Sequence, residues 1–180
     1  SVTTVMTVSF VNAGILTLAQ STGVIMGSNI GTTVTAWIVD YFGFKANIGP
    51  YTLVLLTIGL PLYLINSLRL KGLGSAIIGF ALLFMGLEFL KNAVPEVGPD
   101  SSVVQLFVSL NGIPYINTIL FVIFGTLLTL IIQSSSATIA LTMTLMVSGV
   151  IPFEVGAAMV LGENIGTTIT AGVASTVGNV

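Results

Sequence analysis

The sequence predicts an all-α integral membrane protein with inverted-topology repeats, each containing a re-entrant helical hairpin and a discontinuous transmembrane helix. Hydrophobic residues make up 54% of the 180 residues and charged residues only 6%, whereas an ordinary soluble domain is roughly a quarter charged. Residues 101–153 contain no Asp, Glu, Lys or Arg, and one bilayer crossing needs only about 20 apolar residues. The decapeptide G-S-N-I-G-T-T-V-T-A at 27–36 recurs as G-E-N-I-G-T-T-I-T-A at 162–171.

The repetition extends beyond the decapeptide. The same offset of 135 residues, continued towards the N-terminus without a gap, pairs Ser1, Thr3, Thr7 and Gly14 with Ser136, Thr138, Thr142 and Gly149. The chain therefore carries one design twice. In an apolar chain, a polar segment interrupted by glycine at corresponding positions of two halves indicates the binding site of a transporter.

Composition excludes several other classes. The formal net charge is -2 with four basic residues, which is too few to neutralise a nucleic-acid backbone. The chain has no Cys and no His, so we expect no disulfide, no transition-metal site, no cofactor and no enzymatic acid-base centre. Ser1 begins within an apolar, Thr-rich pattern without a basic segment before it. We therefore expect no cleavable signal peptide and a chain that is cut at its N-terminus.

Residues 1–50 are expected to be the end of the first repeat, with the second arm of a hairpin at Ser1–Val11 and a broken helix at Leu16–Phe44. Residues 51–101 are expected to link the repeats through two spanning helices at 51–68 and 73–90, each about 27 Å long. Charged residues mark the connectors, which are Asp40–Lys45, Arg69–Lys71 and Glu88–Asp100. Gly74, Gly79 and Gly86 would permit close helix packing.

Residues 102–180 are expected to form the second repeat. An apolar run at 116–132 stops at Q-S-S-S-A-T, and Ala140–Val147 then leads to a turn at Ser148 and Gly149, a pattern typical of a re-entrant hairpin. Pro152–Leu161 predicts a half-helix that G-E-N-I-G-T-T interrupts before the helix resumes at Ile169. Backbone freed at such a break is tolerated only in protein or a water-filled cavity, so the tip and the break should face an interior site.

Counting the crossings between the two hairpins places their openings on opposite sides of the membrane, which is the inverted arrangement. Orientation stays open, because Arg69 and Lys71 lie on one side and Lys45 and Lys91 on the other.

Together, Q-S-S-S-A-T followed by G-E-N-I-G-T-T, and S-V-T-T followed by G-S-N-I-G-T-T, resemble the type II sodium-phosphate cotransporter family, which repeats a Q-S-S-S motif in each half. The resemblance covers most of the chain. It implies sodium-driven phosphate uptake, with substrate and sodium sites at the hairpin tips and adjacent helix breaks. The counterparts of Gln133, Ser134 and Ser135 would precede Ser1, so we expect a fragment of a transport core.

Hydroxyl and amide groups at the hairpin tips offer donors to an oxyanion, and the second arm of each hairpin presents a helix N-terminus. The expected phosphate-binding residues are Gln133, Ser134, Ser135, Ser136, Thr138, Ser1 and Thr3. For Q-S-S-S-A-T the alternative is hydrogen bonding that joins two helices.

Neither tip contains Lys or Arg, so bound sodium would have to neutralise the anion. The expected sodium ligands are backbone carbonyls at the breaks and the side chains of Ser28, Asn29, Thr32, Thr33, Glu163, Asn164, Thr167 and Thr168. Glu163 aligns with Ser28 and would ligate a cation, stay protonated or pair structurally. The alternative for the doubled motif is a packing notch.

Other polar residues are expected to be structural. The hydroxyls of Thr7, Thr126, Thr129, Thr142 and Thr144 should bond carbonyls of their own helices. Asp40, Glu88, Glu154, Trp37 and Tyr51 should lie at the membrane interface.

We therefore expect sodium-coupled symport of inorganic phosphate by alternating access. The alternatives are transport of another small oxyanion such as arsenate or sulfate, and a passive channel. The expected partners are phosphate, sodium and the lipid bilayer of the plasma membrane, or of the inner membrane in a bacterium, which the protein crosses several times. Self-association into a homo-oligomer stays open.

Overall fold

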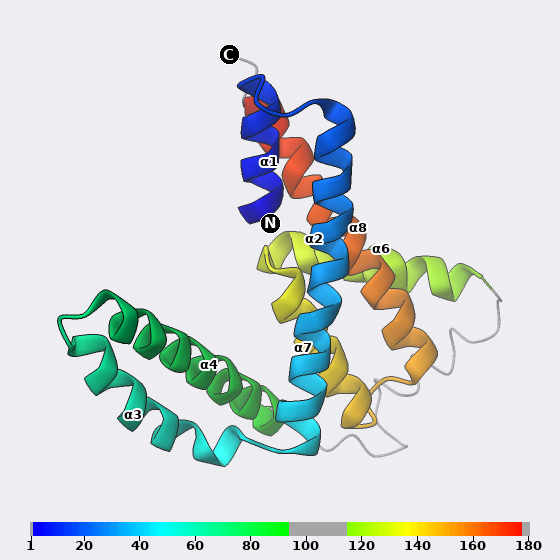
Figure 1. Ribbon diagram of the computed structural model, residues 1–180. Helices are drawn as coiled ribbons and strands as arrows, with labels where there is room; N and C mark the ends of the chain where they lie inside the picture. The colour runs from blue at the N-terminus through cyan, green and yellow to red at the C-terminus, as the bar shows by residue number, and fades with distance from the viewer. Residues whose placement is uncertain (1, 94–114, 178–180) are drawn as a thin grey trace. The chain divides into compact units, whose positions relative to one another are not determined.

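A computed structural model describes residues 2–93 and 115–177, and every secondary-structure element among them is helical (Figure 1). Ser1 and residues 94–114, including part of the expected 88–100 connector, lie outside the described residues. The elements are α1 (Val2–Asn12), α2 (Leu18–Ile38), a π-helix (Val39–Lys45), a 3-10 turn (Gly49–Tyr51), α3 (Thr52–Leu64), α4 (Leu68–Ala93), α6 (Ile116–Ile132), α7 (Ser135–Val147) and α8 (Phe153–Val177).

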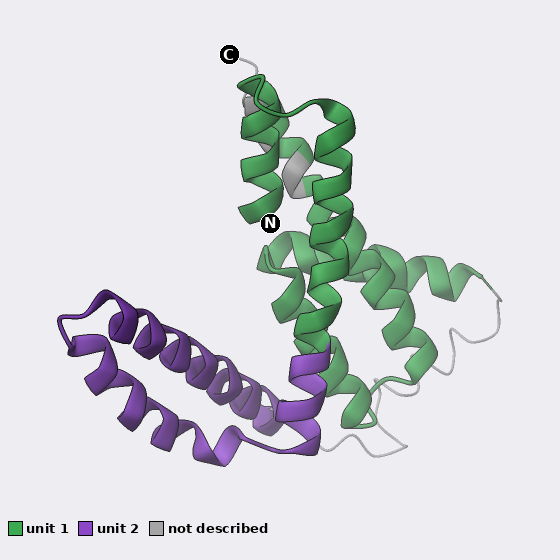
Figure 2. Ribbon diagram, viewed as in Figure 1, with its two compact units in different colours: residues 1–36, 96–180 green, residues 37–95 purple. Residues whose placement is uncertain are grey.

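The helices fall into two compact units (Figure 2). One unit contains residues 1–36 and 96–180, and therefore both copies of the repeated segment. The other contains residues 37–95, and therefore the two linking helices. The three-part division expected from the sequence, with boundaries at 50 and 101, stays a prediction.

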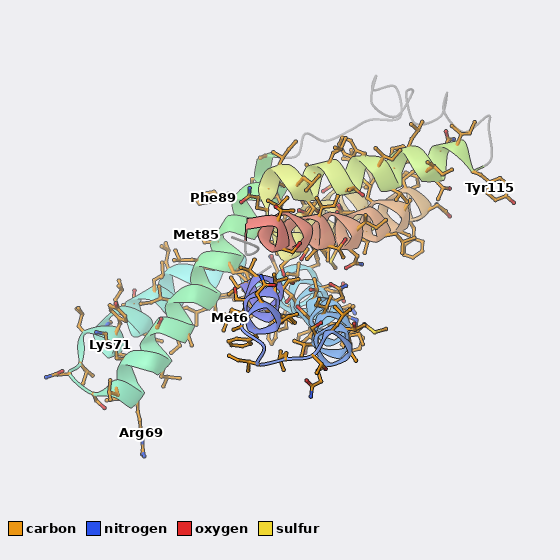
Figure 3. The ribbon with its side chains drawn as sticks, turned by 90° about the horizontal axis from the view of Figure 1, so that it is seen from above. Met6, Arg69, Lys71, Met85, Phe89 and Tyr115 are labelled. Atoms are coloured by element: carbon orange, nitrogen blue, oxygen red, sulfur yellow. The ribbon has the colours of Figure 1, made fainter. Side chains whose placement is uncertain are left out.

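In the linking unit, α3 packs along α4. A side chain at Gly74 would meet the backbone of Tyr63 and Gly59, so the close approach of these helices requires glycine there. Gly79 and Gly86 meet nothing within 4 Å among the described residues, so close packing at these two positions stays a prediction. Arg69 and Lys71 belong to α4, not to a connector, and Arg69 extends away from the ribbon (Figure 3).

The other end of this unit is held together by Lys91. Its Nζ donates to the carbonyl oxygen of Gly43 at 2.5 Å and to Oδ1 of Asn47 at 3.2 Å, and it lies 5.0 Å from the ring centroid of Phe44. Lys91 therefore ties the π-helix and the residues that follow it to the last turn of α4. In the same helix, Phe80 and Phe84 pack with ring centroids 4.6 Å apart.

The repeat seen in the sequence is also a repeat of local structure. The turn between α1 and α2 contains Gly14 with φ of 70°, and the turn between α7 and α8 contains Gly149 with φ of 72°. Both positions favour glycine because an L side chain is strained at positive φ. The amide of Gly14 donates to the carbonyl of Val11 at 3.0 Å, and that of Gly149 donates to Met146 at 3.1 Å. The offset of 135 residues therefore relates two copies of one turn, although α7 packs against α8 and α1 does not pack against α2 to the same extent.

The predicted helix breaks are absent. α2 runs through residues 27–33 and α8 runs through residues 162–168 without interruption. The threonines satisfy their hydroxyls within the helix: Oγ1 of Thr32 donates to the carbonyl of Ser28 at 3.2 Å, and Oγ1 of Thr167 donates to that of Glu163 at 3.1 Å. A helical glycine costs only about 1 kcal/mol relative to alanine, which tertiary packing can offset.

In α8 that packing is supplied by α6. Side chains at Gly162 and Gly166 would meet the backbone of Val122 and Thr126, and one at Gly125 would meet the backbone of Met159. Oγ1 of Thr126 also donates to the carbonyl of Gly162 at 2.9 Å. The glycines of the second motif thus form the packing notch that the sequence left as an alternative.

By length and composition, one described helix, Leu68–Ala93, could cross a membrane. A second would be counted if Leu18–Lys45 and Gly49–Leu64, which are separated by a bend, form one span. The apolar helices α1, α6 and α7 are shorter, at 11, 17 and 13 residues. The inverted topology and the re-entrant hairpin stay predictions.

Candidate functional site

The Q-S-S-S segment ends one helix and begins the next, as the sequence predicts. α6 ends at Ile132, and Gln133 follows in the left-handed conformation with φ of 58°, its amide donating to the carbonyl of Thr129 at 2.7 Å. Ser134 is extended and caps α7, because its Oγ accepts from the amide of Ala137 at 3.3 Å. Only two residues separate the helices, so the serines stand at the N-terminus of α7.

One face of α7 carries a buried polar stripe made of Ser135, Thr138 and Thr142. Their spacing of three and four residues places them on one side of a helix. Ser135 is 9% exposed, and Thr138 and Thr142 are 0% exposed. The stripe therefore runs from the N-terminus of α7 towards its middle inside the unit.

The stripe meets an acid on α8. Glu163 is 0% exposed, and its Oε1 accepts from Oγ1 of Thr142 at 2.6 Å. Its other oxygen, Oε2, is buried without a hydrogen-bond partner among the described residues, and so is Oγ1 of Thr129 on α6. All four basic residues of the chain lie between positions 45 and 91, in the linking unit. A buried carboxylate left without a cation or a proton would be costly.

The structure gathers some of the expected sodium ligands and disperses others. Thr167 is buried beside Glu163. Asn164 is half-buried and donates from Nδ2 to the carbonyl of Val160 at 3.2 Å, whereas Thr168 is exposed and donates to Ile165 at 2.7 Å. Of the eight expected sodium ligands, Glu163 is therefore the buried acid itself, and only Thr167 is buried beside it.

The first repeat shows no comparable cluster in the described part of the chain. Ser28, Asn29 and Thr32 are half-buried, and Thr33 is exposed with its hydroxyl donating to the carbonyl of Ile30 at 2.6 Å. Thr3 is exposed. Ser1 lies outside the described residues.

One residue that the sequence assigned to a structural role belongs to the site: Thr142 was expected to bond its own helix and instead donates to Glu163. The same expectation is wrong for Thr129, whose buried hydroxyl has no hydrogen-bond partner among the described residues. The expectation was correct for Thr126 and Thr144, which donate to Val122 and Ala140, each at 2.8 Å.

The equivalent threonine of the first repeat, unlike Thr142, bonds its own helix. Thr7, the counterpart of Thr142, donates to the carbonyl of Thr3 at 2.7 Å, and the position of Glu163 is taken by Ser28 in that copy. The sequence contained a signal that could have assigned Thr142 to the site. Thr142 aligns with Thr7, whereas the acid Glu163 aligns with the uncharged Ser28, so a buried acid is available only in the second repeat.

The structure also contains a cavity that lies apart from this cluster. A cavity of about 170 Å³ between α1, α2 and the end of α8 is lined mainly by apolar atoms and includes Thr7, Val11 and Ser21. No group of three or more acidic, His or Cys side chains able to hold a metal occurs within residues 2–93 and 115–177.

Comparison with known proteins bears on what this site does. The model of the Na+/Pi-cotransporter family matches residues 1–92 and 114–178. The chain belongs to the Na+/Pi-cotransporter family. Membership in this family, together with the names of the relatives, indicates a membrane transporter and not an enzyme.

The curated relatives are longer than the chain. "Uncharacterized protein YqeW" of Bacillus subtilis is 31% identical over 177 residues, which cover 97% of the chain and 54% of that protein. "Putative inorganic phosphate export protein YjbB" of Escherichia coli is 29% identical over 170 residues, which cover 94% of the chain and 30% of that protein. The Salmonella typhimurium protein of the same name is also 29% identical. No solved structure matches the chain.

Proposed function

We propose that the whole protein carries inorganic phosphate across the membrane together with sodium, by alternating access. The observation that supports this most strongly is the fully buried Glu163, whose Oε2 has no partner in the described residues and whose unit has no basic residue. A carboxylate in that environment suits a monovalent cation. The family and the names of the relatives support phosphate as the substrate.

The anion half of the proposed site is the N-terminus of α7. The amides of Ser135 and Ser136 occupy the first turn, where no carbonyl of the same helix can accept from them. Together with the hydroxyls of Ser134, Ser135 and Ser136 and the positive end of the helix dipole, they offer donors to phosphate oxygens. Thr138 stands one turn further, with its hydroxyl donating to the carbonyl of Ser134 at 2.8 Å.

The cation half is Glu163 with the hydroxyls of Thr142, Thr129 and Thr167. These side-chain oxygens replace the backbone carbonyls expected from helix breaks, because the carbonyls of a continuous helix are engaged in its own hydrogen bonds. The remaining expected sodium ligands of α8, Asn164 and Thr168, and those of the first repeat stay proposals for the complete protein.

The arrangement accounts for coupling through electrostatics. Ser135 and Thr142 are seven residues apart on one helix, or about 10 Å. Opposite unit charges at that separation attract by about 1.7 kcal/mol at an effective dielectric constant of about 20. Bound sodium would therefore strengthen phosphate binding by roughly an order of magnitude, and bound phosphate would strengthen sodium binding equally.

The test is phosphate flux through the full-length protein in proteoliposomes with imposed sodium gradients. Phosphate should move in the direction of the sodium gradient, whichever way it is imposed. E163Q should lose the dependence on sodium, and S135A should raise the KM for phosphate. The control variants are E154Q and S148A, whose side chains are exposed. Flux that does not depend on sodium in the unmodified protein would refute the proposal.

The same measurement addresses the remaining alternatives. Arsenate and sulfate could use the same donors, and competition with phosphate would establish which oxyanion is preferred. Flux that does not saturate with phosphate would indicate a channel. We further propose that the complete protein crosses the plasma membrane, or the inner membrane of a bacterium, several times.

A further inference from the structure

The turn between α3 and α4 forms one end of the linking unit and carries two basic residues. Arg69 and Lys71 are both exposed, and Figure 3 shows them at the end of the unit that lies away from Phe89. The ammonium of Lys71 lies 5.3 Å from the ring centroid of Tyr63 on α3. The aromatic ring therefore holds this charge beside the turn.

The charges at the opposite end of the unit are paired. Nζ of Lys45 lies 3.0 Å from Oδ2 of Asp40, and Nζ of Lys91 lies 3.6 Å from Oε2 of Glu88. The sequence contains no acidic residue between Asp40 and Glu88, and within the described part of this unit neither basic residue of the turn has an ion pair. The turn therefore carries two positive charges that no acid of the unit neutralises.

The length of α4 matches a crossing between these two ends. Lys71 and Glu88 are 17 residues apart on this helix, or about 26 Å, and the hydrocarbon core of a bilayer is about 30 Å thick. Between them, Leu73 and Leu82 are 54% and 49% exposed, as suits a surface in contact with lipid. A crossing by α4 thus places the turn at the level of the phospholipid headgroups.

Exposed apolar side chains accompany the charges at the turn. Leu64 is 79% exposed and Leu68 is 92% exposed. A soluble anion bound at the turn would leave both leucines in water, whereas a phospholipid would cover them with its acyl chains and bring its phosphate to the basic residues. The combination of charge and apolar surface therefore favours a lipid headgroup over a free anion.

We propose that the turn between α3 and α4 binds the headgroup of an anionic phospholipid. The residues of this lipid-binding turn are Tyr63, Leu64, Leu68, Arg69 and Lys71. The two basic side chains neutralise the phosphodiester, and the two leucines lie against the acyl chains. Each basic residue near an anionic surface strengthens binding by about fivefold, so the loss of both should weaken it by about 30-fold. The inference does not depend on sodium coupling or on the transported substrate.

Titration of the full-length protein in detergent with short-chain phosphatidylglycerol tests the proposal, with the Tm as the readout, because a ligand that binds the folded state raises the Tm. R69Q/K71Q should need about 30-fold more of this lipid for the same rise. R69K/K71R keeps both charges and should respond as the unmodified protein does. K45Q removes an exposed charge at the other end of the unit and should also respond normally. An equal response of R69Q/K71Q and the unmodified protein would overturn the proposal.

Two further titrations separate the lipid from other causes of a Tm change. Phosphatidylcholine, which has no net charge, should have the same effect on every variant. Inorganic phosphate should change the Tm of R69Q/K71Q and of the unmodified protein equally, whether or not the protein transports it. A phosphate effect that requires Arg69 and Lys71 would show that the turn takes a free anion, and the assignment to lipid would be wrong.

Mass spectrometry of the purified protein provides a measurement that does not depend on thermal unfolding. The phosphatidylglycerol that remains bound after purification in detergent is counted for each variant. R69Q/K71Q should retain less of it than R69K/K71R, because only the second variant keeps the charges. Equal retention would contradict the proposal.

Discussion

At the scale of single residues, the bond between Thr142 and Glu163 is where the two repeats differ. Thr7 and Thr142 occupy equivalent positions and are both buried, yet one donates to its own helix and the other to a carboxylate on the next helix. Two differences accompany this: Ser28 stands where the second repeat has Glu163, and α7 packs against α8, whereas α1 packs against α8 more than against α2. The second repeat thereby acquires a charged oxygen that the first lacks, so the two proposed cation environments are unequal.

A change at Thr142 should therefore affect sodium more than phosphate. T142V keeps the shape of the side chain and removes the donor to Oε1 of Glu163, and a hydrogen bond to a charged group contributes about 1.5–3 kcal/mol. We expect the sodium concentration for half-maximal flux to rise by about tenfold or more. The comparison variant is T144V, whose hydroxyl bonds only its own helix. Equal sodium dependence in both variants would show that Thr142 has no part in cation binding.

At the scale of helices, glycine determines how closely α6 and α8 approach. G162A should force α6 away, because the added methyl group would meet the backbone of Val122 and Thr126. Such overpacking costs about 1–3 kcal/mol, measurable as a lower free energy of unfolding. G172A adds the same methyl group on the same helix where nothing lies within 4 Å, and it should be neutral or slightly stabilising. A similar loss in both variants would point to the helix itself and not to its contact with α6.

Lys91 should stabilise the linking unit at the end of α4. K91M removes the charge-assisted hydrogen bonds to Gly43 and Asn47, and we expect a loss of about 1–2 kcal/mol because the amine is partly exposed. Lys45 pairs with Asp40 at 3.0 Å, but the Lys45 side chain is 68% exposed and that of Asp40 is 40% exposed, so K45M should change the stability by less than about 1 kcal/mol. Chemical denaturation of the two variants would separate these contributions, and an equal effect would contradict this role for Lys91.

At the scale of the whole molecule, the inverted topology has a direct test. Ala13 and Ser148 occupy equivalent positions beside the turn glycines and are both exposed. If the repeats are inverted, a cysteine at Ala13 and one at Ser148 should react with a membrane-impermeant maleimide from opposite sides of the bilayer. The chain has no cysteine of its own, although the rest of the protein would need the same property. Reaction of both positions from one side would establish parallel repeats.

Local features of the sequence predicted local structure well. The stop of the apolar run at Q-S-S-S and the turn at Ser148 and Gly149 depend on residues within a few positions of one another, and both are confirmed. The helix breaks were wrong because G-x-N-I-G-T-T is compatible with both a break and a helix. Contact with α6, which the sequence does not display, stabilises the helix in α8.

The residues alone establish that the chain is apolar and duplicated, because composition and a repeat at a fixed offset do not depend on how the helices pack. The packing of the helices was needed to establish that α8 is continuous, that its glycines receive α6, and that Thr142 donates to Glu163 instead of to its own helix. Each of these outcomes depends on groups from two helices. Which neighbour a glycine or a hydroxyl meets is fixed by packing, not by the motif in which it stands.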